Sequence, residues 1–205
     1  MKLKQTLQVL ITCGALSVAV NADTIFNFDS DAVGTSTTFT ATVNSLSATF
    51  SSSADPGGFI IYSSMFDTLT GNVLGDPGPS GLGGLNLDIS FSQDLASVSL
   101  DFATADFGTA SPLTITAYEN STLIGSATAT GEFPNGFMFP EGEVNFAGSP
   151  FNQLVVSSSA PDFAVDNIDV VAAPEPTALA LFALGLFALG IPALKRTFAD
   201  KSNKV

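Results

Sequence analysis

Apolar and polar residues alternate with a period of two through the middle of the chain, which is the pattern of half-buried β-strands. Residues 85–91 and 98–102 alternate strictly. No stretch of the middle repeats its apolar residues every three to four positions, so no amphipathic helix is predicted there. The expected strands are residues 24–28, 39–43, 46–50, 85–91, 98–102, 113–118, 123–129, 144–146, 153–157 and 163–170.

The spacing of these strands predicts the fold class. Short strands punctuated by turn residues every ~8–12 positions are typical of an all-β sandwich. Residues 119–122 form a hairpin turn between two of the strands. The glycine-rich residues 71–84 contain two prolines and no lysine, so they read as a loop and not as a phosphate-binding motif. We expect one jelly-roll-like β-sandwich domain over residues 23–172.

The two ends of the chain have a different composition. Basic residues, an apolar stretch and small residues at Val20 and Ala22 predict a signal peptide, residues 1–22, that is cleaved before Asp23. The only cysteine, Cys13, lies in this leader, so the exported domain has no disulfide. Lipidation of Cys13 is an alternative interpretation of the leader. At the other end, the uncharged residues 178–194 would span about 26 Å as a helix and predict a transmembrane segment.

The last residues of the chain contain three ordered elements. These are the tetrapeptide Pro174, Glu175, Pro176 and Thr177, then the apolar residues 178–194, then the basic pair Lys195 and Arg196, followed by a polar end, residues 197–205, predicted to be cytoplasmic.

This order resembles the PEP-CTERM sorting signal of Gram-negative bacteria over residues 173–196. The resemblance implies an exosortase-type membrane protease as a partner, transient anchoring in the membrane, and delivery to the cell surface or extracellular matrix. It also implies an association with exopolysaccharide and biofilm. A plain single-pass anchor is the alternative.

The predicted domain carries no positive charge. Residues 23–173 contain thirteen aspartates and four glutamates but no lysine, arginine or histidine. Binding to nucleic acid or phosphate needs cationic side chains, so we expect neither. Ser–His and Cys–His nucleophiles and the usual zinc sites are excluded because histidine and cysteine are missing. Carboxylate chemistry and oxygen-liganded metals such as Ca²⁺ remain.

Two aspartates are the candidate ligands of such a metal. The segments 26–29 and 163–170 resemble carbohydrate-binding jelly rolls of the galactose-binding-like type, which often hold a structural Ca²⁺ between their first and last strands. This resemblance implies Asp29 and Asp166 as metal ligands. Alternation places Asp166 on the same face as apolar Ile168, which indicates a buried carboxylate. From the residues alone, its partner is either a metal or backbone N–H groups.

We therefore expect an exported protein with a structural or adhesive role in an exopolysaccharide matrix, and no enzyme activity. The first alternative is a carbohydrate-binding module, which an exposed aromatic platform would favour; residues 131–151 hold five phenylalanines. The second is a carboxylate-dependent glycan hydrolase or lyase, which two facing carboxylates in a cleft would favour. Glu141 and Glu143, predicted on one face of a strand, are a candidate pair that seventeen acids make common by chance.

Overall fold

The computed structural model describes residues 23–76, 84–105 and 108–174, and this part of the chain is all-β. It contains no helix that is long and apolar enough to cross a membrane. The predicted leader and nearly all of the predicted sorting tail lie outside the described residues. The strands are β1 (Thr24–Phe26), β2 (Phe39–Val43), β3 (Leu46–Ser51), β4 (Ile60–Ser63), β5 (Asn72–Gly75), β6 (Leu87–Thr104), β7 (Pro112–Glu119), β8 (Thr122–Thr130), β9 (Glu141–Ser158) and β10 (Phe163–Ala172).

All ten strands belong to one hydrogen-bonded sheet that is doubled over on itself. The long strands β6 and β9 are antiparallel neighbours along most of their length, with register shifts near their middles. The first half of β6 pairs with β3, and its second half pairs with β10. Each long strand therefore contributes to both layers of a sandwich, because β-bulges bend strands and shift the side-chain alternation.

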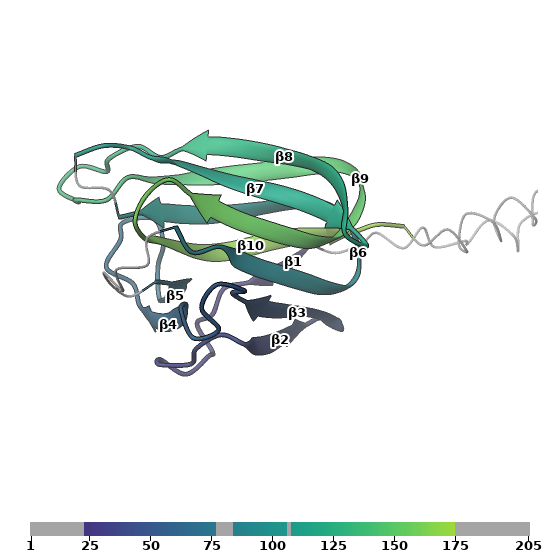
Figure 1. Cartoon of the computed structure of the whole chain (residues 1–205). Coiled ribbons are helices and arrows are strands. Elements are labelled where there is room, and N and C mark those ends of the chain that lie inside the picture. Colours follow the sequence, from purple (N-terminus) through teal and green to yellow (C-terminus); the bar gives the residue numbers. More distant parts are fainter. Residues whose placement is uncertain (1–22, 77–83, 106–107, 175–205) are drawn as a thin grey trace, which may run out of the picture.

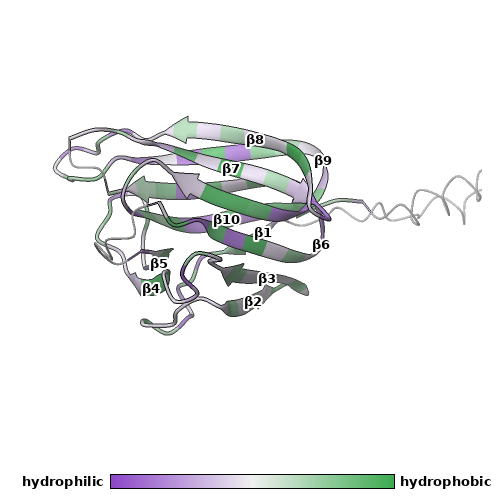
Figure 2. Ribbon diagram, viewed as in Figure 1, coloured by the Kyte–Doolittle hydropathy of each residue, from purple (hydrophilic) through white to green (hydrophobic). Residues whose placement is uncertain are grey.

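One hydrophobic core lies between the two layers. Hydrophobic and hydrophilic residues form bands along the strands (Figure 2), and the apolar faces of both layers point inward. Phenylalanine dominates this core: Phe50 stacks on Phe39 at 5.0 Å between ring centroids and contacts Phe28 edge-on at 5.3 Å. Each buried large side chain contributes roughly 1.5–3 kcal/mol of transfer free energy.

A second, smaller cluster lies on the outer face of the layer that contains β10. The segment between β4 and β5 folds over this face, and its Leu69 packs with Val73, Ala103 and Ala164. The side chains of Ala103 and Ala164 are small, which leaves room for the covering segment. The outer face is consequently covered near the start of β10 and open further along it.

The sequence-predicted strands are confirmed, with two joined pairs. Residues 87–91 of the predicted strand 85–91 and residues 98–102 fall within the single strand β6, which begins two residues later than predicted, and residues 144–146 and 153–157 fall within β9. The strands β4 and β5 were not predicted, and β5 occupies part of the segment expected to be a loop. The two central residues of the predicted hairpin turn, Asn120 and Ser121, both have positive φ, as a two-residue hairpin turn requires.

The predicted alternation around Asp166 is wrong in one respect. Ile168 packs in the core with Val165, on the opposite face from Asp166. Asn167 has a φ of 46° and is the extra residue of a bulge, because Asp166 pairs with Asp101 but Asp169 pairs with Ser99. The bulge reverses the side-chain alternation of the rest of β10.

Candidate functional site

Asp29 and Asp166, the two predicted ligands, meet at a junction between three strands. β5 pairs with residues 164–165 of β10, and β1 pairs with residues 168–170 of the same strand. The gap between β1 and β5 falls at the bulge, next to Asp166. Asp29 follows β1 and accepts a 2.9 Å hydrogen bond from the backbone N–H of Asn72, the first residue of β5. The structure thus brings the carboxylates of Asp29 and Asp166 into the same electrostatic neighbourhood.

The backbone around Asp29 is adapted to this contact. Phe28 has a φ of 54°, which is unusual for a bulky residue, and Gly71 has a φ of 72°. A Cβ atom at position 71 would lie 1.8 Å from Oδ1 of Asp29. Only glycine permits this approach, so the turn before β5 is shaped to receive the carboxylate.

Asp166 is a buried carboxylate without a cationic partner. It is 1% exposed, and the backbone N–H groups of Asn167 (2.8 Å) and Thr70 hydrogen-bond to it. Burial raises the pKa of Asp166 to about 7, and the nearby carboxylates of Asp29 and Asp101 add to this rise. Backbone donors therefore supply part of what the carboxylate needs, and its negative charge stays uncompensated by any described residue.

A row of acidic residues continues from Asp166 across the sheet. Asp166 lies opposite Asp101 on β6, and Asp101 lies opposite Glu143 on β9. Like charges directly across a ladder repel. The side-chain amide of Asn167 donates a 3.0 Å hydrogen bond to Asp101 and relieves part of this repulsion. Among the described residues, no three acidic side chains are arranged so that they could hold one metal ion.

Glu141 and Glu143 share one face of β9, as predicted, but only one of them is buried. Glu141 is 5% exposed, and its carboxylate accepts hydrogen bonds from the backbone N–H groups of Asp67 (2.9 Å) and Thr68 (2.6 Å) and from the Thr68 hydroxyl (2.5 Å). Glu141 therefore fastens the segment between β4 and β5 onto the sheet. Glu143 is exposed. The pair does not face a common cleft, so it has the geometry of a structural clamp and not of a catalytic pair.

Large apolar side chains are exposed at the end of the sandwich where this clamp lies. The loop between β8 and β9 carries Phe133, Phe137 and Met138, which are 44%, 39% and 61% exposed, and the neighbouring β4–β5 segment carries Met65, 61% exposed. We call these four side chains the apolar tip. Phe66 and Phe139 join the two loops through an edge-on contact of 5.6 Å between ring centroids.

The apolar tip lies far from the point where the chain leaves the domain. β10 begins beside Thr104, near the clamp, and ends beside Leu95, where the N–H of Ala173 donates to the carbonyl of Asp94. Figure 1 shows the β8–β9 loop at the left end of the sandwich and the C-terminal trace at the right end. Asp94 is part of β6, at its bend.

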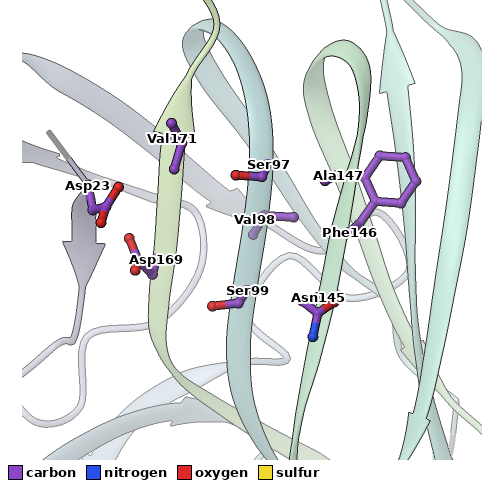
Figure 3. A pocket seen from close by; sticks show the side chains of 9 residues that line it. All are labelled: Asp23, Ser97, Val98, Ser99, Asn145, Phe146, Ala147, Asp169 and Val171. Carbon is purple, nitrogen blue, oxygen red and sulfur yellow. The ribbon is translucent and has the colours of Figure 1, made fainter. Parts of the chain in front are cut away.

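An open groove with a volume of about 190 Å³ crosses the outer face near this second end. Its polar lining consists of Asp23, Ser97, Ser99, Asn145 and Asp169, which come from β6, β9, β10 and the residue before β1. In Figure 3 the serine hydroxyls point toward β10, which carries Asp169. The Asp23 side chain, from the start of the neighbouring strand, lies beside that of Asp169. Burial and the charge of Asp23 raise the pKa of Asp169.

The residue pattern predicted part of this site. It indicated that Asp166 is buried, and it drew attention to the phenylalanine-rich residues 131–151. It did not separate exposed Phe133 and Phe137 from buried Phe151 and half-buried Phe146, whose rings pack together at 5.5 Å. The groove was missed, because Ser97, Ser99 and Asn145 lie in ordinary alternating positions and carry no motif.

No protein-family model and no curated protein sequence matches this chain. Solved structures do match. The K2 cleaved adhesin domain of Lys-gingipain aligns with a TM-score of 0.50 and 14% identity, covering 73% of this chain and 99% of that one. A family 35 carbohydrate-binding module from Clostridium thermocellum aligns with a TM-score of 0.38 and 16% identity, covering 74% of this chain and 99% of the module.

Other solved structures match with similarly low TM-scores and sequence identities. Family 6 and family 11 carbohydrate-binding modules recur among them. The catalytic domain of a GH87 α-1,3-glucanase aligns with a TM-score of 0.38 and 12% identity over 75% of this chain, which spans 29% of that domain. The structural neighbours are therefore largely carbohydrate-binding modules. The adhesin match shows a shared fold, and the lower-scoring matches carry no argument about function.

Proposed function

We propose that the domain is a non-catalytic adhesive module that binds a polysaccharide at the apolar tip. The observation that carries this proposal is the exposure of Phe133, Phe137 and Met138 on the β8–β9 loop and of Met65 on the β4–β5 segment, which Glu141 fastens to the sheet. Exposed apolar side chains gathered at one place mark interaction sites. Flat aromatic rings offer apolar area to the faces of sugar rings at little cost in conformational entropy.

The charge of the domain narrows the class of polysaccharide. The exposed carboxylates of Glu132 and Asp67 flank the apolar tip, and no cationic side chain occurs in residues 23–173. Anionic sugars would be repelled at close range. We therefore propose a neutral or amine-bearing glycan as the ligand.

Binding is favoured over hydrolysis by the placement of the acids. Asp23 and Asp169 lie beside each other along neighbouring strands, on the same side of an open groove. Hydrolysis needs two carboxylates on opposite sides of the scissile bond. The adhesin domain with the same fold is an independent reason to favour an adhesive role.

Calorimetry on the purified full-length protein tests the binding site. Chitin, chitosan and hyaluronan oligosaccharides of matched length are the neutral, cationic and anionic probes. We expect Phe133→Ala and Phe137→Ala each to weaken binding of the neutral or cationic probe by about fivefold or more, which corresponds to ~1 kcal/mol. Leu123→Ala removes an apolar side chain elsewhere that is even more exposed than the two phenylalanines, and it is the control. Unchanged affinity in both phenylalanine variants would rule out the apolar tip.

We propose further that Ca²⁺ binds between Asp29 and Asp166. The residues fit a hard, oxygen-liganded cation in charge and donor type, because a carboxylate whose pKa is raised by burial, and further by two other carboxylates, is stabilised by a nearby cation. Since no three acids of the described residues are arranged to hold one ion, carbonyl or amide oxygens would complete the coordination. The ion would supply charge neutralisation and hold β1, β5 and β10 together.

Delivery to the cell surface or matrix by an exosortase-type system is part of the same proposal. It rests on the sequence of residues 174–196. Replacing Pro174, Glu175 and Pro176 by alanine should leave the full-length protein in the inner membrane, as followed by cell fractionation. Release of a shortened form in unchanged amount would contradict the sorting proposal and leave the binding proposal untouched.

A further inference from the structure

The groove contains a carboxylate oxygen that lacks a partner. Oδ1 of Asp169 is buried and accepts no hydrogen bond from any described residue. The N–H of Val170 supports the same carboxylate. An unpartnered buried acceptor costs roughly 1–3 kcal/mol, and more when it is charged. A donor, preferably a cationic one, is therefore expected at this place.

Asp23 lies close enough to the Asp169 carboxyl for its charge to affect it. β1 runs antiparallel beside β10, with Thr24 opposite Val170 and Ile25 opposite Asp169. The backbone nitrogen of Asp23 is thus held at the edge of the sheet, one residue from the pair that contains Val170. Figure 3 shows the Asp23 and Asp169 side chains side by side on the outer face. As part of an uncleaved chain, Asp23 brings only a second negative charge.

Cleavage of the leader adds a positive charge to Asp23 beside the negative charge of its side chain. Small residues at Val20 and Ala22 place the expected cut before Asp23. Hydrolysis of that peptide bond by water, in a peptidase, leaves a carboxylate on Ala22 and an amino group on Asp23. At neutral pH this amino group is largely protonated, since α-amino groups have a pKa of ~8. It then has three N–H donors and one positive charge.

We infer that the α-ammonium of the mature N-terminus is the missing partner of Asp169. In the processed protein it donates to the carboxylate and fastens β1 to β10. It is then the only positive charge between positions 23 and 173, where the sequence has no lysine, arginine or histidine. Removal of the leader therefore completes the folded domain, and the domain reaches its full stability only after export.

The test separates the position of the amino group from all other effects of processing. A Gly-Ser insertion between Ala22 and Asp23 keeps the residues before the cut and moves the new N-terminus two residues away. The protein is expressed with its leader and exported, with and without the insertion, in the native background and in an Asp169→Asn background. N-terminal sequencing establishes where each chain begins. Thermal unfolding at pH 6.5 gives the Tm of all four proteins.

We expect the insertion to lower Tm by roughly 2–4 °C in the native background. In the Asp169→Asn background it should have no effect, because the partner of the amino group is gone. Asp55→Asn, in an exposed turn, is the matched control and should keep the full difference. In NMR titrations, the pKa of the Asp169 carboxyl should be lower in the native mature protein than in the protein with the insertion.

The inference fails if the insertion has the same effect on Tm in both backgrounds. It also fails if the Asp169 carboxyl titrates identically in both proteins. A mature chain that begins at a residue other than Asp23 would overturn it directly. None of these outcomes depends on glycan binding, so the proposed function is tested separately.

Discussion

At the scale of single residues, two buried carboxylates have opposite surroundings. Glu141 receives three hydrogen bonds from one segment, whereas Asp166 lies near Asp29 and Asp101, whose charges disfavour its ionised form. The number of donors and the sign of the neighbouring charges decide whether a buried acid stabilises a fold. The sequence showed the acids but not their donors, because most of the donors lie in the segment between β4 and β5, which no pattern predicted, and the donor N–H of Asn167 lies at a bulge.

The titration of Asp166 should be visible in the stability of the metal-free protein. Its pKa is raised from the ordinary value of 3.8 to about 7 in the folded state. The stabilising contribution is therefore complete below pH ~4 and is lost as the pH rises through about 7. In chelator, we expect the free energy of unfolding to fall by up to roughly 4 kcal/mol from this group between pH 4 and 8.

Asp166→Asn should remove this part of the pH dependence, since asparagine has the same shape and does not ionise. Urea unfolding at several pH values in chelator measures it. Asp55→Asn, in an exposed turn, should keep the wild-type slope. Parallel curves for wild type and Asp166→Asn would show that Asp166 is ionised at ordinary pH in the folded protein.

Glu141→Ala should destabilise the domain by about 2–4 kcal/mol, because the N–H groups of Asp67 and Thr68 lose a charged acceptor. Glu143→Ala, two residues further on the same face, should change stability by less than ~0.5 kcal/mol because its side chain is exposed. Chemical unfolding of the two variants decides between a clamp and a surface acid. Equal losses would contradict the structural role given to Glu141.

At the scale of elements, prediction succeeded where alternation was regular and failed at bends and short strands. β2 and β7 were predicted within a residue or two because each is one uninterrupted alternating run, and β8 was predicted equally well although its register with β7 shifts near its start. β4 and β5 have four residues each, too few to establish a period. The bulge at Asn167 was invisible, since asparagine fits both a strand and a left-handed position. The apolar tip depends on exposure, which only the packing of both loops determines.

The turn before β5 gives a prediction at this scale. Gly71→Ala should destabilise the protein by roughly 1–3 kcal/mol, because a side chain at a φ of 72° is strained and displaces the carboxylate of Asp29. It should also weaken any Ca²⁺-dependent stabilisation, since Asp29 moves. Gly136→Ala is the control: it has a φ of 88°, but nothing lies within 4 Å of an added Cβ. The difference between the two variants measures the contact with Asp29 apart from backbone strain.

At the scale of the whole molecule, the main electrostatic feature is the excess of negative charge. Thirteen aspartates and four glutamates in one domain without a basic side chain must repel one another. The fold counters part of this repulsion with backbone donors, with the amide of Asn167 and with burial of Glu141. Repulsion remains along the row formed by Asp166, Asp101 and Glu143. A cation that binds near it would stabilise the folded state more than the unfolded chain, in which the acids are far apart.

Ca²⁺ should therefore raise the stability of the protein specifically. For one site and free ion at ~100 times the dissociation constant, the expected gain is about 2.7 kcal/mol. Sodium chloride at equal ionic strength screens all the acids alike and should give less. Asp166→Asn should lose most of the Ca²⁺-dependent gain while its stability in chelator stays equal or rises, whereas Asp55→Asn should keep the gain. Calorimetric melts that coincide in Ca²⁺ and in chelator would remove the metal from this account, and backbone donors and the Asn167 amide would then be the stabilising partners of the acidic row.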